Sequence, residues 1–152
     1  MIMVMISQDE DSLAGLLADF FRSKGILSMK ADSIIPGADN TMLDSTGKYV
    51  IISTGIHCNG VLEAASYGSK SFTAAVCINP VFDSGLKKKM SGISVPVLFI
   101  SGNDDASPEC ISATNYHDLT SGSKHARIKC RSSEISGRME QVLDAILKFL
   151  GD

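Results

Sequence analysis

The sequence lacks the cysteine spacing that marks many metal-binding domains. Its four cysteines, Cys58, Cys77, Cys110 and Cys130, form no Cys-x-x-Cys pair, which is the usual spacing in zinc-finger-like sites. Cys77 lies in an apolar run and Cys130 in an alternating one, so we interpret both as small core residues. We therefore predict no metal site and no disulfide.

Long apolar runs and an excess of positive charge are also absent. No stretch approaches the roughly 18 apolar residues of a membrane span, and the apolar start at residues 1–6 is short and has no basic segment before it. We therefore expect a cytoplasmic protein with no membrane partner. The 14 basic and 17 acidic residues give a net charge of −3, which argues against nucleic acid as a partner.

Phosphate-binding motifs are missing as well. No Gly-x-Gly-x-x-Gly follows an expected strand, and no Gly-Lys-Ser or Gly-Lys-Thr forms a P-loop. We therefore predict no cofactor. A flavodoxin-like or other nucleotide-free doubly wound fold remains an alternative at this point.

The sequence does contain a regular alternation of strand and helix patterns. Leucine and phenylalanine recur at helical spacing over residues 13–21, and residues 49–53 are typical of a buried strand. The expected strands are residues 2–6, 26–31, 49–53, 72–78, 95–100 and 125–130, and the expected helices are residues 13–24, 61–67, 108–119 and 139–150. This order predicts an α/β fold, a three-layer α/β/α sandwich on a mostly parallel six-stranded sheet.

The length and the absence of a linker predict one domain over residues 1–152. With strand order 2-1-3-4-5-6, the order reverses between the first and third strands, and ligands bind at the carboxyl ends beside such a point. The loops there contain Gln8 and Asp9, and the turn Gly55-Ile56-His57-Cys58-Asn59-Gly60. Gln8, Asp9 and Cys58 are therefore the candidate residues for binding a small-molecule ligand.

Three segments together resemble the α/β-hydrolase superfamily, in a minimal form similar to dienelactone hydrolases and esterases. The strand at residues 49–53 and the turn at 55–60 are similar to the family's nucleophile elbow. Residues 95–105 look like the penultimate strand and acid loop, and the last helix resembles the C-terminal helix. The resemblance covers nearly the whole chain, lacks the family's first two strands, and implies hydrolysis of a carboxylic ester or thioester.

The resemblance also implies candidate catalytic residues. The acid would be Asp105, and the elbow spacing puts His57 at the nucleophile position with Gly55 two residues before it. A shift of one residue would put Cys58 there instead, but then the bulky Ile56 stands where a small residue is needed. We favour His57 at the apex and keep Cys58 as the alternative.

Two departures from the family pattern favour a degenerate site. The loop after the last strand, residues 131–137, contains no histidine, and His125 precedes that strand. The carboxylates around Asp9 would oppose a developing oxyanion. We therefore predict a pseudoenzyme, a non-catalytic small-molecule-binding or interaction module. The alternative is an active esterase or thioesterase that uses Cys58.

Other interpretations stay open at this point. A metal site could use His57, Cys58, Cys110 and His117, and His57 alone could serve phosphoryl transfer. Asp104 or Asp105 could instead cap the helix that begins near Pro108. The strand at 26–31 would form an exposed edge, so a homodimer through that edge is a further hypothesis.

Overall fold

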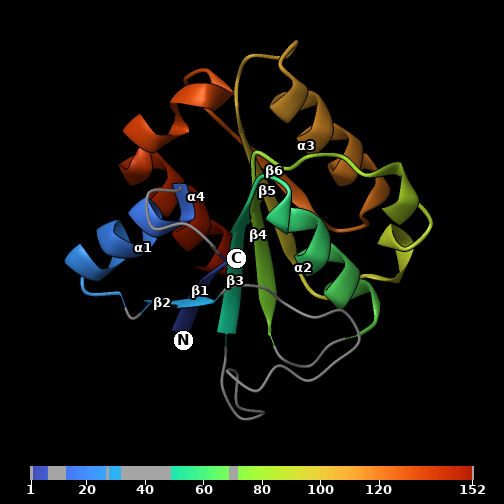
Figure 1. Cartoon of the computed structure of the whole chain (residues 1–152), viewed down its shortest axis with the longest axis horizontal. Helices are drawn as coiled ribbons and strands as arrows, with labels where there is room; N and C mark the ends of the chain where they lie inside the picture. Colours follow the sequence, from blue (N-terminus) through green and yellow to red (C-terminus); the bar gives the residue numbers. More distant parts are fainter. Residues whose placement is uncertain (1, 7–12, 27, 32–48, 69–71, 152) are drawn as a thin grey trace.

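The computed structural model describes residues 2–6, 13–26, 28–31, 49–68 and 72–151 (Figure 1). The candidate ligand-binding residues Gln8 and Asp9 lie outside these ranges. The described strands are β1 (Ile2–Ile6), β2 (Ser28–Ala31), β3 (Tyr49–Thr54), β4 (Ala74–Ile78), β5 (Val97–Gly102) and β6 (Lys124–Ile128). The α-helices are α1 (Leu13–Ser23), α2 (His57–Ser66), α3 (Pro108–Leu119) and α4 (Met139–Gly151).

The strands form a parallel sheet in the order β2-β1-β3-β4-β5-β6. This confirms the predicted α/β class and the predicted strand order. All residues of β4 and β5 are buried, because helices cover both faces of the sheet and leave no solvated side. The order reverses between β1 and β3, so the turn after β3 lies where ligands bind in such sheets.

The helices form two layers, with α1 and α4 on one face of the sheet and α2 and α3 on the other (Figure 1). Successive β3 side chains point to opposite faces, so Val50 and Ile52 join the α1/α4 core while Tyr49 and Ile51 join the α2/α3 core. The first core includes Leu17, Phe21, Val142 and Ile146, and the second includes Val61, Leu62, Ala113 and Tyr116.

Helix α2 begins four residues earlier than the sequence predicts, at His57 rather than residue 61. The reason is the backbone at Gly55, whose φ of +57° reverses the chain immediately after β3. Asn59 and Gly60 are weak helix formers, so their pattern favoured a turn, but the packing of Cys58, Val61 and Leu62 on the sheet holds them in the helix.

Smaller differences occur at the other boundaries. β2 begins at Ser28 rather than residue 26, and β6 spans Lys124–Ile128 rather than 125–130. The basic connection at 83–94 contains two short 3₁₀ segments, Ser84–Leu86 and Met90–Gly92, and a third, Ser132–Gly137, follows β6. Among the described residues, no helix is long and apolar enough to cross a bilayer.

Candidate functional site

The turn between β3 and α2 reverses the chain at Gly55. The φ of +57° at Gly55 lies in the left-handed region that side chains disfavour. A Cβ added there would have no heavy atom within 4 Å. The apex of the turn therefore consists of backbone with open space above it, and no side chain projects from it.

The two residues predicted at the apex lie in the helix instead. His57 is the first residue of α2 and is partly exposed. Cys58 is fully buried, with its Sγ 3.9 Å from the carbonyl oxygen of Ile78. The hydrogen bond that the Cys77 thiol makes to Cys58, together with burial, raises the pKa of Cys77. The structure thus places Cys58 among core groups of α2 and β4, below the apex.

The loop after β4 is tied to α2 through Tyr116. The Tyr116 hydroxyl donates to Asn59 Oδ1 at 2.6 Å and accepts from the Asp83 backbone N–H at 2.8 Å. Burial raises the pKa of Tyr116 to about 12, so the hydroxyl keeps its proton at neutral pH. Two apolar side chains remain exposed near these segments, Ile56 at 66% and Val81 at 49%.

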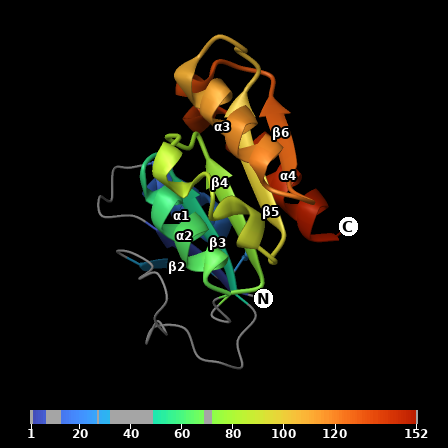
Figure 2. The same ribbon diagram turned by 90° about the vertical axis from the view of Figure 1, so that its right-hand side faces the viewer.

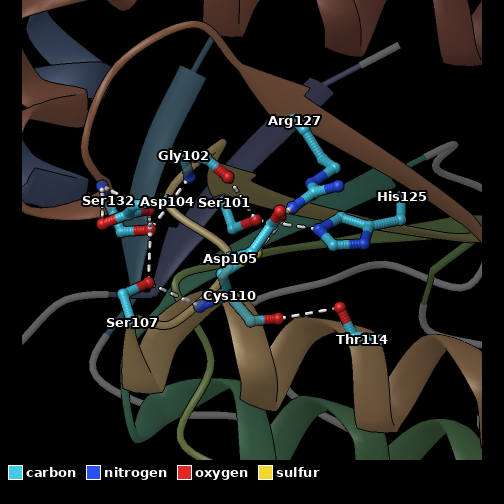
Figure 3. Close-up of polar contacts among 10 residues, drawn as sticks. All are labelled: Ser101, Gly102, Asp104, Asp105, Ser107, Cys110, Thr114, His125, Arg127 and Ser132. Atoms are coloured by element: carbon cyan, nitrogen blue, oxygen red, sulfur yellow. Dashed lines mark hydrogen bonds and ion pairs between the residues drawn. The ribbon is translucent and has the colours of Figure 1, made fainter.

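The loop after β5 carries a carboxylate with a full set of partners. Asp104 accepts hydrogen bonds from Ser132 Oγ at 2.7 Å and from the Ser132 backbone N–H at 3.0 Å (Figure 3). These bonds hold the pKa of Asp104 below its usual value. Ser132 is 1% exposed, and its Oγ also accepts the Gly102 backbone N–H at 3.0 Å. Asp104 and Ser132 therefore join the loops after β5 and β6.

Gly102 allows these two loops to approach each other. A Cβ on Gly102 would lie 2.4 Å from both the Cys130 carbonyl oxygen and the Ser132 nitrogen, a distance at which atoms overlap. The Asn79 side-chain amide adds a third loop, because it donates to the Ser132 carbonyl oxygen at 2.8 Å. The loops after β4, β5 and β6 are thus held together around the buried Ser132.

Asp105, the acid that the resemblance implies, points elsewhere. It is exposed and forms an ion pair with Arg127 of β6, whose Nη2 donates to Cys110 Sγ at 3.4 Å (Figure 3). Asp105 therefore lies on the α3 side of β6, while its neighbour Asp104 contacts Ser132. Neither Asp104 nor Asp105 caps α3. Ser107 caps it instead, because its Oγ accepts a hydrogen bond from the Cys110 backbone N–H.

No protein-family model and no curated protein matches this sequence. Solved structures match over nearly the whole chain. They include a predicted CIB-like hydrolase from Thermoplasma acidophilum, with 16% identity over 98% of this chain and 84% of that one at a TM-score of 0.72. They also include Est1E from Butyrivibrio proteoclasticus with ferulic acid bound, with 12% identity, coverage of 99% and 90%, and a TM-score of 0.70. The carboxylesterase CesB from Bacillus subtilis matches with 11% identity, coverage of 98% and 83%, and a TM-score of 0.69.

This chain has an α/β-hydrolase fold. At such identities the likeness describes the fold and carries no activity with it. In α/β-hydrolases the nucleophile stands on the strained strand-to-helix turn, and in this chain the residue with positive φ in the turn after β3 is Gly55. The loop after the last strand, where the resemblance places the catalytic histidine, presents Ser132 to Asp104.

The histidines of this α/β-hydrolase fold lie away from that loop. His125 is within β6, where its Nε2 is 2.8 Å from Ser101 Oγ, and burial together with His117 lowers its pKa. His117 Nδ1 is 2.8 Å from Ser123 Oγ. Within the described residues, no three or more histidine, cysteine, aspartate or glutamate side chains gather where they could hold a metal ion.

Sequence reasoning did not single out the backbone reversal at Gly55 or the contact between Asp104 and Ser132. A signal existed for Gly55, because it comes directly after the last β-branched residue of the strand, and a glycine there favours an immediate reversal. Asp104 and Asp105 are adjacent and chemically identical, so only the loop conformation distinguishes them. Ser132 had no signal, because its role depends on a contact with a residue 28 positions earlier in the chain.

Proposed function

We propose that this chain is a non-catalytic α/β-hydrolase-fold protein that binds a small molecule at the carboxyl end of the sheet, beside Gly55. The observation that carries the proposal is the conformation of Gly55 at the elbow. Covalent hydrolysis in this fold needs a serine, cysteine or aspartate side chain at that place. A glycine has none, so the elbow offers backbone and open space to a ligand.

The acid loop supports the same conclusion. A catalytic acid in this fold orients a histidine that accepts the proton of the nucleophile. Asp104 instead receives both the hydroxyl and the backbone N–H of Ser132. A serine hydroxyl is not a base near neutral pH. No general base therefore connects the elbow to the acid for proton transfer.

The surroundings of the elbow favour an acyl compound as the ligand. A Cβ at Gly55 would meet nothing within 4 Å, and the exposed apolar side chains of Ile56 and Val81 lie on the segments that follow β3 and β4. Small-molecule sites are lined mainly by apolar groups with a few polar ones. Carboxylic acids and esters with an apolar body are therefore the probes of choice, and ferulic acid, which Est1E binds, is a natural first member.

The test is a thermal-shift screen with esters, carboxylic acids, acyl compounds and short peptides, followed by calorimetry on the best compound. Gly55→Asn places a side chain in the open space, and asparagine tolerates positive φ better than other side chains. Gly122→Asn is the matched control, because Gly122 has φ of +75° and equally open surroundings. We expect Gly55→Asn to weaken binding at least tenfold and Gly122→Asn to leave it unchanged. A screen in which no compound raises the melting temperature would contradict the binding role.

A cysteine-dependent hydrolase is the competing function, and burial argues against it. Cys58 has 0% exposure and faces the Ile78 carbonyl, so a substrate carbonyl cannot reach its sulfur without opening α2. We expect iodoacetamide to leave Cys58 unmodified in the folded protein, and Cys58→Ser to leave the turnover of p-nitrophenyl acetate at the background rate. Turnover that disappears in Cys58→Ser would replace our proposal with the hydrolase.

The two edges of the described sheet are β2 and β6. A homodimer through β2 is still a prediction, which light scattering tests directly. A monomeric mass would count against it.

A further inference from the structure

Two of the three histidines of this chain lie close together between α3 and β6. His117 is in the last turn of α3 and His125 is the second residue of β6, so only residues 118–124 separate them. Figure 2 shows α3 lying along β5 and β6. The ring centres of the two histidines are 6.0 Å apart, and the rings are tilted by 55°. A short helix–turn–strand unit therefore brings the two imidazoles together.

The His117 ring is oriented by the turn that follows α3. Ser123 Oγ donates to the Thr120 carbonyl oxygen at 2.8 Å and lies 2.8 Å from His117 Nδ1. A serine hydroxyl has a single proton to donate, and the Thr120 carbonyl accepts it. The remaining contact therefore requires that the N–H of His117 Nδ1 donates to Ser123. In the neutral ring the lone pair is then on Nε2 of His117.

The His125 ring is oriented in the same way by the buried Ser101 of β5. Ser101 Oγ donates to the Gly102 carbonyl oxygen at 2.9 Å and lies 2.8 Å from His125 Nε2 (Figure 3). His125 therefore donates from Nε2, and its lone pair is on Nδ1. Burial and the neighbouring His117 lower the pKa of His125, so this ring is mostly neutral at pH 7. Within the described residues, neither His117 Nε2 nor His125 Nδ1 has a hydrogen-bond partner.

This arrangement has the features of histidines that bind metal ions. A metal-binding histidine offers the lone pair of one ring nitrogen, while the other nitrogen donates to a neighbouring group that fixes the ring. Zinc binds imidazole nitrogen at about 2.1 Å, which places two ring centres on one ion about 5 to 6 Å apart. The separation of 6.0 Å between His117 and His125 is at the upper end of this range. Both side chains are only partly buried, so a hydrated ion can reach them.

We propose that His117 Nε2 and His125 Nδ1 together bind one divalent metal ion of the kind that prefers imidazole ligands, such as Zn²⁺ or Ni²⁺. The chain supplies two ligands, because no third histidine, cysteine, aspartate or glutamate gathers with them among the described residues, and water supplies the others. The exposed carboxylate of Asp118 lies near enough to raise the pKa of His125, and it adds negative charge beside the ion. The elbow is a separate site, because it follows the carboxyl end of β3 whereas His125 is near the amino end of the parallel β6.

The test titrates the metal-free full chain with nickel chloride at neutral pH and measures the heat of binding. We expect saturable binding of one ion per chain. His117→Gln and His125→Gln should each weaken binding at least tenfold, because glutamine is polar but has no imidazole lone pair. His57→Gln is the matched control, since it removes the remaining, partly exposed histidine, and it should change the affinity less than twofold. Magnesium chloride should not bind, because Mg²⁺ prefers oxygen ligands.

Two measurements on the parent protein do not depend on whether a variant folds. Zinc should shift the ring-proton resonances of His117 and His125 and leave those of His57 in place. Cobalt bound by these histidines should lack the strong near-ultraviolet absorption of cobalt–thiolate bonds, which would instead indicate cysteine ligands. Thiolate absorption, or zinc shifts confined to His57, would overturn the proposal. So would the absence of saturable nickel binding, or nickel binding that both substitutions leave unchanged.

Discussion

The elbow after β3 and the acid loop after β5 each depend on one glycine, but for different physical reasons. Gly55 is required for its backbone conformation, with φ of +57°, and the space around it is empty. Gly102 has no positive φ, and a Cβ there would overlap the backbone of Cys130 and Ser132. The first glycine leaves an opening at the surface, and the second closes a packed junction.

The difference shows that one of the two loops is open and the other is packed. The elbow makes a sharp reversal at Gly55, which carries no side chain. The acid loop keeps a carboxylate and uses it to hold Ser132, Gly102 and the loop after β6 together. We infer that the elbow is the loop that is open to ligands, whereas the acid loop contributes to stability.

Gly102→Ala should cause the largest loss of stability. The added methyl must displace the backbone at Cys130 and Ser132, and such overpacking costs about 3 kcal/mol. Urea denaturation measures the free energy of unfolding. Gly137→Ala, in the 3₁₀ segment after β6 where a Cβ meets nothing within 4 Å, should change it by less than about 0.5 kcal/mol. Equal effects at the two sites would refute the close approach at Gly102.

Ser132→Ala should have the next largest effect. It removes the hydroxyl that donates to Asp104 and accepts the buried Gly102 N–H, and an unsatisfied buried donor costs about 2 kcal/mol. Chemical denaturation of Ser133→Ala, the adjacent exposed serine, provides the baseline. If both variants were equally stable, Ser132 would not link the loops in the way we describe.

Gly55→Ala should cost less, about 1 kcal/mol, because only the positive φ is penalised and nothing is overlapped. The melting temperature and the free energy of unfolding both report this change. The comparison with Gly102→Ala is the direct test of the contrast between the two loops. An effect at Gly55 larger than at Gly102 would reverse our assignment of which loop is open and which is packed.

The smallest effect concerns pH. Hydrogen bonds from Ser132 hold the pKa of Asp104 below its usual value of 3.8. The stabilisation is therefore complete above about pH 4 and is lost as the pH falls through the lowered pKa of the folded state. Asp104→Asn should flatten this acid decline, measured as the free energy of unfolding against pH from about 6 to 2. A variant with the same decline as the parent would show that Asp104 does not contribute to it.

Much of the fold followed from local patterns. The alternation of strands and helices, the strand order and the bounds of α3 at Pro108–Leu119 were all predicted, and the structure confirms them. These features arise from the periodic spacing of apolar side chains along the sequence and from short-range signals such as a proline in the first helical turn. The start of α2 was predicted too late, because Asn59 and Gly60 disfavour a helix locally while packing of Cys58 on the sheet requires one.

By itself the sequence determined that this protein is a doubly wound α/β domain resembling the hydrolases, with no histidine in the loop after its last strand. Only the tertiary structure decided which residue stands at the elbow apex and which of two adjacent aspartates joins the loops. The first set depends on periodicity along the chain. The second depends on backbone torsions and on contacts between residues far apart in sequence, such as Asp104 with Ser132.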